Sequence, residues 1–255
     1  MTRELHWERL AGPEVAALAR ETNVAVLPVG CMEMHGPHLP TGTDAYHAME
    51  LCDRAVAIEP AVVLPPIWYN VNDQMQGYPG TIHIPIPVLR EHYHCICLEC
   101  ARNGFDRILF MVGHGGSQTP IDELQSRALE QRTRTGHWEY FPLQTFISSL
   151  MADEIKELNF HPYDGHGGSL EASWMLAARP DLVHLERVTE PGPVRERAVP
   201  HTRPRVPWIR QVPFGYTCDP REATAEKGDK MLSAAARRLA EVIAKLKIFD
   251  PEKDH

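Results

Sequence analysis

The sequence predicts an α/β fold built on a mostly parallel sheet. The first observation is a pair of apolar runs, at residues 24–29 and 107–112, whose composition suits strands buried on both faces. The second is the alternation of such runs with longer segments that carry apolar residues at helical spacing. The third is the glycine-rich turn after each run, where a parallel strand would end and a helix would begin.

In the first half of the chain, three helices and four strands are expected. The helices are residues 7–19, 45–58 and 88–103. The strands are residues 24–29, 61–64, 82–86 and 107–112. Gly12 and Pro13 interrupt the first helix, Pro60 and Gly104 end the other two, and Pro85 favours an edge strand at 82–86.

In the second half, the helical pattern dominates. The expected helices are residues 120–135, part of 145–158, the segment from Ser169 to Pro180, and 219–247; a strand is expected at 137–142. Asp219 and Pro220 have the composition of a helix start, with an acid three residues after the cap. Residues 186–213 are rich in proline and arginine, and we interpret them as a surface loop or a subunit contact.

Bulk properties narrow the class of protein. At 255 residues the chain fits one large domain, although its length also permits two. The net charge of −8 and the lack of a basic run argue against a nucleic-acid or anionic-membrane partner. No apolar stretch is long enough to span a bilayer, and the N-terminus lacks the apolar segment of a signal peptide. We therefore expect a cytoplasmic protein with reduced cysteines.

The stretch 28–44 (PVGCMEMHGPHLPTGTD) joins the first core strand to a helix and carries the strongest chemical signal. Glu33 and His35 are two apart, so on an extended chain both side chains point to the same side. Asp44 stands near a helix start, where it or Thr43 would be the N-cap. Together these oxygen and nitrogen donors are typical of a metal site. The alternative is a turn-rich loop with a capping aspartate.

Further candidates follow other strands and open another helix. His114 comes directly after the run 107–112, and His166 and Glu171 flank the start of the helix at Ser169. Ligands of parallel sheets bind beyond the carboxyl ends of strands, so these side chains are expected to share one site with Glu33 and Asp44. Glu171 could instead serve only as an acid in a first helical turn.

Two other groups have open interpretations. Residues 70–81 form a polar, Gly/Pro-punctuated loop that either lines a pocket or only connects elements. The candidate substrate-binding residues in and before this loop are Trp68, Tyr69, Asn72, Gln74 and Tyr78. The group Cys95, Cys97 and Cys100 spreads around a helix, so we interpret it as small buried thiols rather than a zinc or redox cluster.

Four ordered motifs give the chain a family resemblance. PVGCMEMHGPHLPTGTD resembles the signature of the creatininase (creatinine amidohydrolase) family, and VGHGGS resembles its second motif. HGGSLEAS with LAARPDLV resembles the third motif, and CDPREATAEKG resembles the fourth. The matches cover roughly residues 20 to 245, which is nearly the whole chain. The chain departs from the pattern at four positions: Cys31 replaces the usual serine, Val112 and Ser117 replace family asparagines, and Gly116 stands where creatininase proper has an acidic ligand.

The resemblance implies a three-layer α/β/α fold in a single metallohydrolase domain over residues 1–255, assembled as a homo-oligomer, commonly a hexamer, or as a dimer. It implies one or two divalent ions per subunit, with zinc as first choice and manganese or iron as alternatives. The implied metal ligands are Glu33, His35, Asp44, His114 and Glu171. Asp44 would bridge two ions, and His166 would match the catalytic histidine of the family.

The expected activity is hydrolysis of a small molecule by metal-activated water. The water would attack the carbonyl of a small cyclic amide or formamide, and His166 or Glu171 would carry the proton to the leaving nitrogen. Three alternatives stay open: ring opening of a cyclic polyol ketone such as a dehydro-inosose, a non-catalytic metal-bound binding protein, and a thiol enzyme that uses Cys31. Chelation separates them, because a thiol enzyme should survive loss of the metal.

Overall fold

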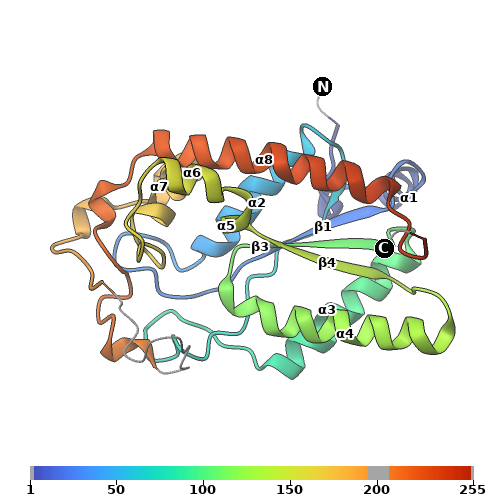
Figure 1. Cartoon of the computed structure of the whole chain (residues 1–255), viewed down its shortest axis with the longest axis horizontal. Helices are drawn as coiled ribbons and strands as arrows, with labels where there is room; N and C mark the ends of the chain where they lie inside the picture. The colour runs from blue at the N-terminus through green and yellow to red at the C-terminus, as the bar shows by residue number, and fades with distance from the viewer. Residues whose placement is uncertain (1–2, 195–206, 254–255) are drawn as a thin grey trace.

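The computed structural model describes residues 3–194 and 207–253, and its centre is a parallel four-stranded sheet (Figure 1). The strands are β1 (Val24–Val29), β2 (Val62–Val63), β3 (Arg107–Val112) and β4 (Phe141–Phe146), in the order β2–β1–β3–β4. β1 and β3 pair along six residues each and are almost completely buried. Their continuous apolar runs match this position in the middle of the sheet.

Helices cover both faces of the sheet, which confirms the predicted α/β class. The helices are α1 (Gly12–Glu21), α2 (Thr43–Val56), α3 (Ile86–Arg102), α4 (Gln118–Thr135), α5 (Ile147–Leu150), α6 (Ala152–Glu157), α7 (Ser169–Ala178) and α8 (Ala225–Ile248). Helices α2, α7 and α8 pack together on one face, and α3 and α4 pack together on the other (Figure 1). None of the helices in the described ranges has the length and apolar character that a bilayer-spanning segment needs.

The order of the strands explains why α2 and α3 lie on opposite faces of the sheet. Each parallel connection is right-handed, so the direction of the step decides the face that its helix covers. The step from β1 to β2 and the step from β2 to β3 run in opposite directions, which places α2 and α3 on opposite faces. The chain therefore leaves β1 toward β2 and leaves β3 toward β4, so the connections from these two neighbouring strands run in opposite directions. This divergence is the switch point of the sheet, where ligands of open α/β folds bind.

Apolar side chains fill the space between the sheet and both helix layers. On one face, Tyr93 of α3 packs edge-on against Phe110 of β3, with ring centroids 5.4 Å apart. On the other face, Leu51 of α2 and Leu239 and Ile243 of α8 are completely buried. Each such side chain stabilises the fold by about 1.5–3 kcal/mol, so the core holds the sheet firmly beneath the loops at its carboxyl edge.

The predicted strand at 82–86 is wrong. In the structure only an isolated bridge joins His83 to Asn70, and α3 begins at Ile86. Pro85 is the N-cap and Pro87 lies in the first turn, where a missing N–H costs nothing. The prolines therefore mark a helix start rather than an edge strand.

Other boundaries also differ from the prediction. The first helix is two elements, a 3₁₀ turn at Trp7–Arg9 and then α1, which begins at the Gly12-Pro13 pair that was expected to interrupt it. The strand predicted at 137–142 is β4, which begins at Phe141 and runs to Phe146. Asp219 caps only the 3₁₀ turn Pro220–Glu222, and Thr224 is the N-cap of α8. Part of the predicted loop at 186–213, residues 195–206, lies outside the described residues.

Candidate metal centre

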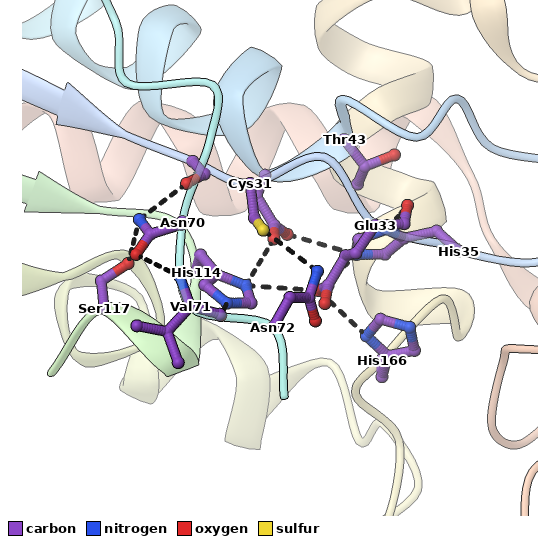
Figure 2. A network of polar contacts seen from close by, with 12 residues as sticks. Cys31, Glu33, His35, Thr43, Asn70, Val71, Asn72, His114, Ser117 and His166 are labelled. Atoms are coloured by element: carbon purple, nitrogen blue, oxygen red, sulfur yellow. Dashed lines mark hydrogen bonds and ion pairs between the residues drawn. The ribbon is translucent and has the colours of Figure 1, made fainter. Parts of the chain in front are cut away.

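The loops after β1 and β3 and the loop into α7 bring the predicted donors together in one cluster (Figure 2). Glu33 is at its centre, because one carboxylate oxygen faces three imidazoles. The oxygen Glu33 Oε1 lies 3.3 Å from His114 Nδ1, 3.5 Å from His166 Nδ1 and 3.6 Å from His35 Nε2. These residues come from positions up to 133 apart in the chain, counted from 33 to 166.

Asp44 connects the two sides of the cluster. Its Oδ1 lies 3.2 Å from His35 Nε2, and its Oδ2 lies 2.8 Å from His114 Nδ1. Glu171 Oε2 lies 3.4 Å from the same nitrogen of His35. The carboxylate of Asp44 therefore has one oxygen on each of two neighbouring donor groups, His35 with Glu171 and His114 with Glu33.

Two glycines allow Asp44 to reach this position. A Cβ at Gly30, at the end of β1, would lie 2.3 Å from the backbone of Ala45, and a Cβ at Gly113 would lie 2.4 Å from the carbonyl oxygen of Asp44. Only glycine lets the first turn of α2 approach both strand ends so closely. The predicted capping role is wrong, because the N-cap of α2 is Gly42. The carboxylate of Asp44 is therefore free to face the imidazoles.

Backbone groups orient the donors from outside the cluster. The Nε2–H of His114 donates to the carbonyl of Val71 at 2.7 Å, and the Nε2–H of His166 donates to the carbonyl of Met34 at 2.6 Å. A carbonyl oxygen only accepts, so these bonds turn Nδ1 of both rings toward Glu33. The backbone N–H of Gly167 donates to Glu171 Oε2 at 2.7 Å. Such outer contacts are typical of metal-ligating histidines and carboxylates.

Burial and the neighbouring charges shift the pKa values of the histidines and carboxylates in the cluster. Burial alone would lower the pKa of His35, but Asp44, Glu171 and Glu33 outweigh it and raise the pKa to about 10. Burial raises the pKa of Glu171 to about 8. Burial and the neighbouring His35 lower the pKa of His166 to about 4, so this imidazole is neutral near pH 7. The carboxylates around His35 therefore attract positive charge, which a proton supplies here and a bound cation could supply instead.

The cluster lowers the stability of the fold. Burying charged side chains costs several kcal/mol per group, and apolar side chains of similar volume would stabilise the core better. In addition, His35 is fully buried and its Nε2 makes no hydrogen bond within the described ranges, although three carboxylates lie within 3.6 Å of it. This nitrogen points into a space where an ion could bind. Nitrogen and carboxylate donors suit Zn²⁺ and Mn²⁺ alike.

A cavity of about 320 Å³ opens onto the cluster, and its size fits a small ligand. Asn72 and Gln74 line this cavity, together with Glu33, Asp44, His114, His166 and Glu171. The structure does not bring the other candidate substrate-binding residues to it. Trp68 and Tyr69 line a separate apolar depression near α3, and the buried Tyr78 donates its hydroxyl to the carbonyl of Val212.

Sequence reasoning missed Trp208, which forms one wall of the cavity. Its ring stands edge-on against His166, with centroids 5.3 Å apart, and its indole N–H donates to Gln74 Oε1 at 2.5 Å. Trp208 lies within the proline- and arginine-rich stretch 186–213, where a single tryptophan gives no periodic or motif signal. Only the folded chain places it beside the donors.

The remaining sequence features stay apart from the donors. The prediction of buried thiols is confirmed for Cys97 and Cys100 and wrong for Cys95, which is exposed. None of the metal-type clusters in the described part of the chain includes them. Gly116 leaves no room for a side chain, because a Cβ there would lie 2.4 Å from the carbonyl oxygen of Val71 and 2.5 Å from His114 Nε2.

A parallel α/β sheet with a buried carboxylate–imidazole cluster at its switch point has the architecture of a metallohydrolase. The chain belongs to the creatininase family: the family model described as creatinine amidohydrolase matches residues 8–243. It is 28% identical to the creatinine amidohydrolase of Pseudomonas putida over 94% of each chain. It is 26% identical to the mycofactocin precursor peptide peptidase of Mycolicibacterium smegmatis, over 91% of this chain and 87% of that one.

Solved structures agree with this assignment. A crystal structure of creatinine amidohydrolase superposes with a TM-score of 0.87 at 26% identity, covering 98% of this chain and all of that one. Two similar structures are described as a manganese creatininase and as a mutant creatininase of the Zn–Zn type. The predicted family, its enzyme class of amidohydrolases and the α/β fold are confirmed.

Proposed function

We propose that this chain is a metal-dependent amidohydrolase that binds two divalent ions and hydrolyses the C–N bond of a small cyclic amide or formamide. The observation that supports this most is the position of Asp44. Its two oxygens face different imidazoles, His35 at 3.2 Å and His114 at 2.8 Å, as a carboxylate shared by two ions would.

Each side of Asp44 offers a set of donors. His35, Asp44 and Glu171 form one set, whose ligand atoms lie within 4.8 Å of one another. Glu33 and His114 form the other set with the second oxygen of Asp44. When bound, divalent ions would lower the pKa of a coordinated water to about 7 and polarise a substrate carbonyl.

The protein's own groups would then position the substrate and carry the proton. His166 is the proposed proton carrier, because its Nδ1 faces the cluster while its Nε2–H is held by Met34. Glu171 is the second candidate, because its carboxylate faces His35 at 3.4 Å and also lines the cavity. Trp208 and Gln74 would close the cavity on one side and exclude water from the reacting bond.

An amide is the favoured substrate class. The two relatives named above are described as a creatinine amidohydrolase and a peptide peptidase, so both names point to C–N bonds of the amide type. The cavity of about 320 Å³ is small, which favours a cyclic amide or formamide over a long peptide. A 3-dehydro-scyllo-inosose hydrolase of Thermotoga maritima is 22% identical, and this chain covers only 61% of it, which supports the ring-opening alternative less.

The test is a substrate screen with the metal state controlled. Zn²⁺- or Mn²⁺-loaded protein would be incubated with cyclic amides, formamides, short peptides and inosose ketones, and products would be identified by mass. We expect an amide or formamide to gain one water, EDTA to abolish this turnover, and added metal to restore it. Turnover of ketones alone would establish the ring-opening alternative. Turnover that survives EDTA would contradict the proposal, and so would loaded protein that turns over none of these compounds.

The homo-oligomer implied by the family resemblance is also part of the proposal. Its support is an apolar surface near α3 that includes Tyr69 and Val88, which are 54% and 58% exposed. Exposed apolar patches often mark protein contacts. Light scattering of the purified chain would test the assembly, and a monomeric mass would contradict it.

A further inference from the structure

A third buried donor group lies on the Glu33 side of the cluster and includes a thiol. Cys31 Sγ, a carboxylate oxygen of Glu33 and a ring nitrogen of His114 all lie within 4.8 Å of one another. Cys31 is completely buried, and the other two side chains are nearly so. Three protein atoms at such distances can contact one ion, because thiolate, imidazole and carboxylate bind Zn²⁺ at about 2.0–2.3 Å.

The surroundings of Cys31 suit a ligating sulfur. The side-chain amide of Asn72 donates to Cys31 Sγ at 3.1 Å, so the sulfur accepts a hydrogen bond (Figure 2). The backbone N–H of Asn72 donates to His83 Nδ1 at 2.8 Å, which fixes the residue that makes this contact. Hydrogen bonds to sulfur are a means by which proteins tune metal-bound thiolates.

A nucleophilic role for Cys31 does not fit the same geometry. Cys31 is 0% exposed and does not line the cavity, so a substrate carbonyl cannot reach its sulfur. His114, the nearest base, has Nε2 bonded to Val71 and Nδ1 facing Asp44 and Glu33. An ion is small enough to bind between these side chains where a substrate is not.

A neighbouring nitrogen points independently to an ion in this space. His35 Nε2 is buried, makes no hydrogen bond to any residue that the structure describes, and lies 3.6 Å from Glu33 Oε1. Glu33 therefore contacts both the group that contains the thiol and a nitrogen without a hydrogen-bond partner among these residues. The Nε2 atom of His35 is therefore a further atom beside this carboxylate that could coordinate an ion.

We propose that Cys31 is a further ligand of the ion held by Glu33 and His114, a proposal that rests on the metal-dependent function above. On binding, the Sγ–H bond breaks, a bond forms between Sγ and the ion with both electrons supplied by sulfur, and the proton leaves to solvent. No oxidant or reductant is required. The Glu33 side then has a sulfur donor, whereas the His35 side has only nitrogen and oxygen donors.

The proposal predicts that the two sides of the centre prefer different metals. Thiolate is a soft ligand that favours Zn²⁺, whereas carboxylate and imidazole alone also accept Mn²⁺. Zn²⁺ should therefore bind first on the Cys31 side, and Cys31→Ser should reduce the preference for Zn²⁺ over Mn²⁺. Loss of the amide in Asn72→Ala should weaken Zn²⁺ binding by about 10–100-fold, as is usual for outer-shell partners of metal ligands.

The test uses Co²⁺ as a spectroscopic probe in the full chain. Metal-free protein would be titrated with Co²⁺, and absorption would be recorded together with bound cobalt. We expect a sulfur-to-cobalt charge-transfer band that saturates at one ion per chain, is absent in Cys31→Ser, and persists in Cys95→Ser. Cys95 is the matched control, because it is exposed on α3. X-ray absorption of the zinc form should add one sulfur at about 2.3 Å.

The outcomes separate this proposal from the proposed function. Cobalt that binds without the band, or a band that survives in Cys31→Ser, would overturn the sulfur ligand while leaving metal-dependent hydrolysis intact. Protein that binds no cobalt, zinc or manganese would overturn both. If Cys31→Ser does not fold, the zinc X-ray absorption of the wild-type chain decides alone, because absence of a sulfur neighbour contradicts the proposal.

Discussion

At the level of a single residue, Glu33 is a buried carboxylate in a position where an apolar side chain would stabilise the fold better. Its carboxylate is 4% exposed as a residue and faces three imidazoles within 3.6 Å. In a protein interior such a group is retained only where it is paired or binds an ion. The residue types were visible in the sequence, but their convergence on one oxygen is a property of the folded chain.

His166 provides the prediction at this scale. Replacing it in His166→Asn should leave both ions bound and reduce kcat by about 10²–10⁴-fold, because the proposed proton carrier is lost while the ligands remain. Turnover and bound metal would be measured on the same samples. His161→Asn is the matched control on the same loop, outside the cavity lining, and should retain full turnover.

A result in which His166→Asn keeps its turnover would exclude the proton-carrier role. Loss of an ion in this variant would instead make His166 a ligand, since its Nδ1 lies 3.5 Å from Glu33 Oε1. The sequence could identify His166 as a candidate from its place before Ser169. It could not identify Trp208, which reaches the same ring only through tertiary packing.

At the scale of elements, the site depends on how closely α2 approaches the ends of β1 and β3. Gly30 and Gly113 make this approach possible, and Asn70 ties the neighbouring loops by donating to the carbonyl of Gly30 at 2.9 Å and to the hydroxyl of Ser117 at 2.8 Å. The strand ends, the helix start and the loop after β2 are therefore held as one unit.

Gly30→Ala tests this arrangement. Its Cβ would lie 2.3 Å from the backbone of Ala45, so α2 must move away, and we expect a loss of about 1–3 kcal/mol in unfolding free energy together with weaker metal binding. Gly115→Ala is the matched control, because apart from its chain neighbours no atom of the described residues lies within 4 Å of its Cβ position. Thermal unfolding of both variants would measure the effect. Equal stability of Gly30→Ala and the wild-type chain would contradict the close packing.

Elements also show where sequence reasoning succeeds and where it does not. The two apolar runs predicted β1 and β3 correctly, because six-residue runs that end at a glycine-rich turn are too short for a typical helix and suit strands buried on both faces. Pro85 and Asp219 misled the prediction. A proline suits both an edge strand and a first helical turn, and an Asp-Pro pair suits both a long helix and a 3₁₀ turn. Tertiary contacts decide between them.

At the scale of the whole molecule, the order β2–β1–β3–β4 places the carboxyl ends of β1 and β3 at the switch point. Glu33 and Asp44 follow β1, and His114 follows β3, so the topology brings them together from distant positions in the chain. α7, which packs against α2 and α8, adds Glu171 from the same face. The family motifs predicted this set of residues, whereas the distances between them and the contact of Cys31 with Asn72 arise only in the folded chain.

We propose that the carboxylate of Asp44 is shared by two bound ions, and the metal content of the protein is the measurement that tests this. Protein equilibrated with Zn²⁺ or Mn²⁺ and then freed of unbound metal would be analysed by mass spectrometry of the elements. We predict two ions per chain for the wild-type protein, fewer than one for Asp44→Asn, and two for Asp53→Asn, a control on the same helix. A wild-type chain without bound metal, or an Asp44→Asn variant that keeps two ions with an unchanged fold, would contradict a metal site that Asp44 shares between two ions.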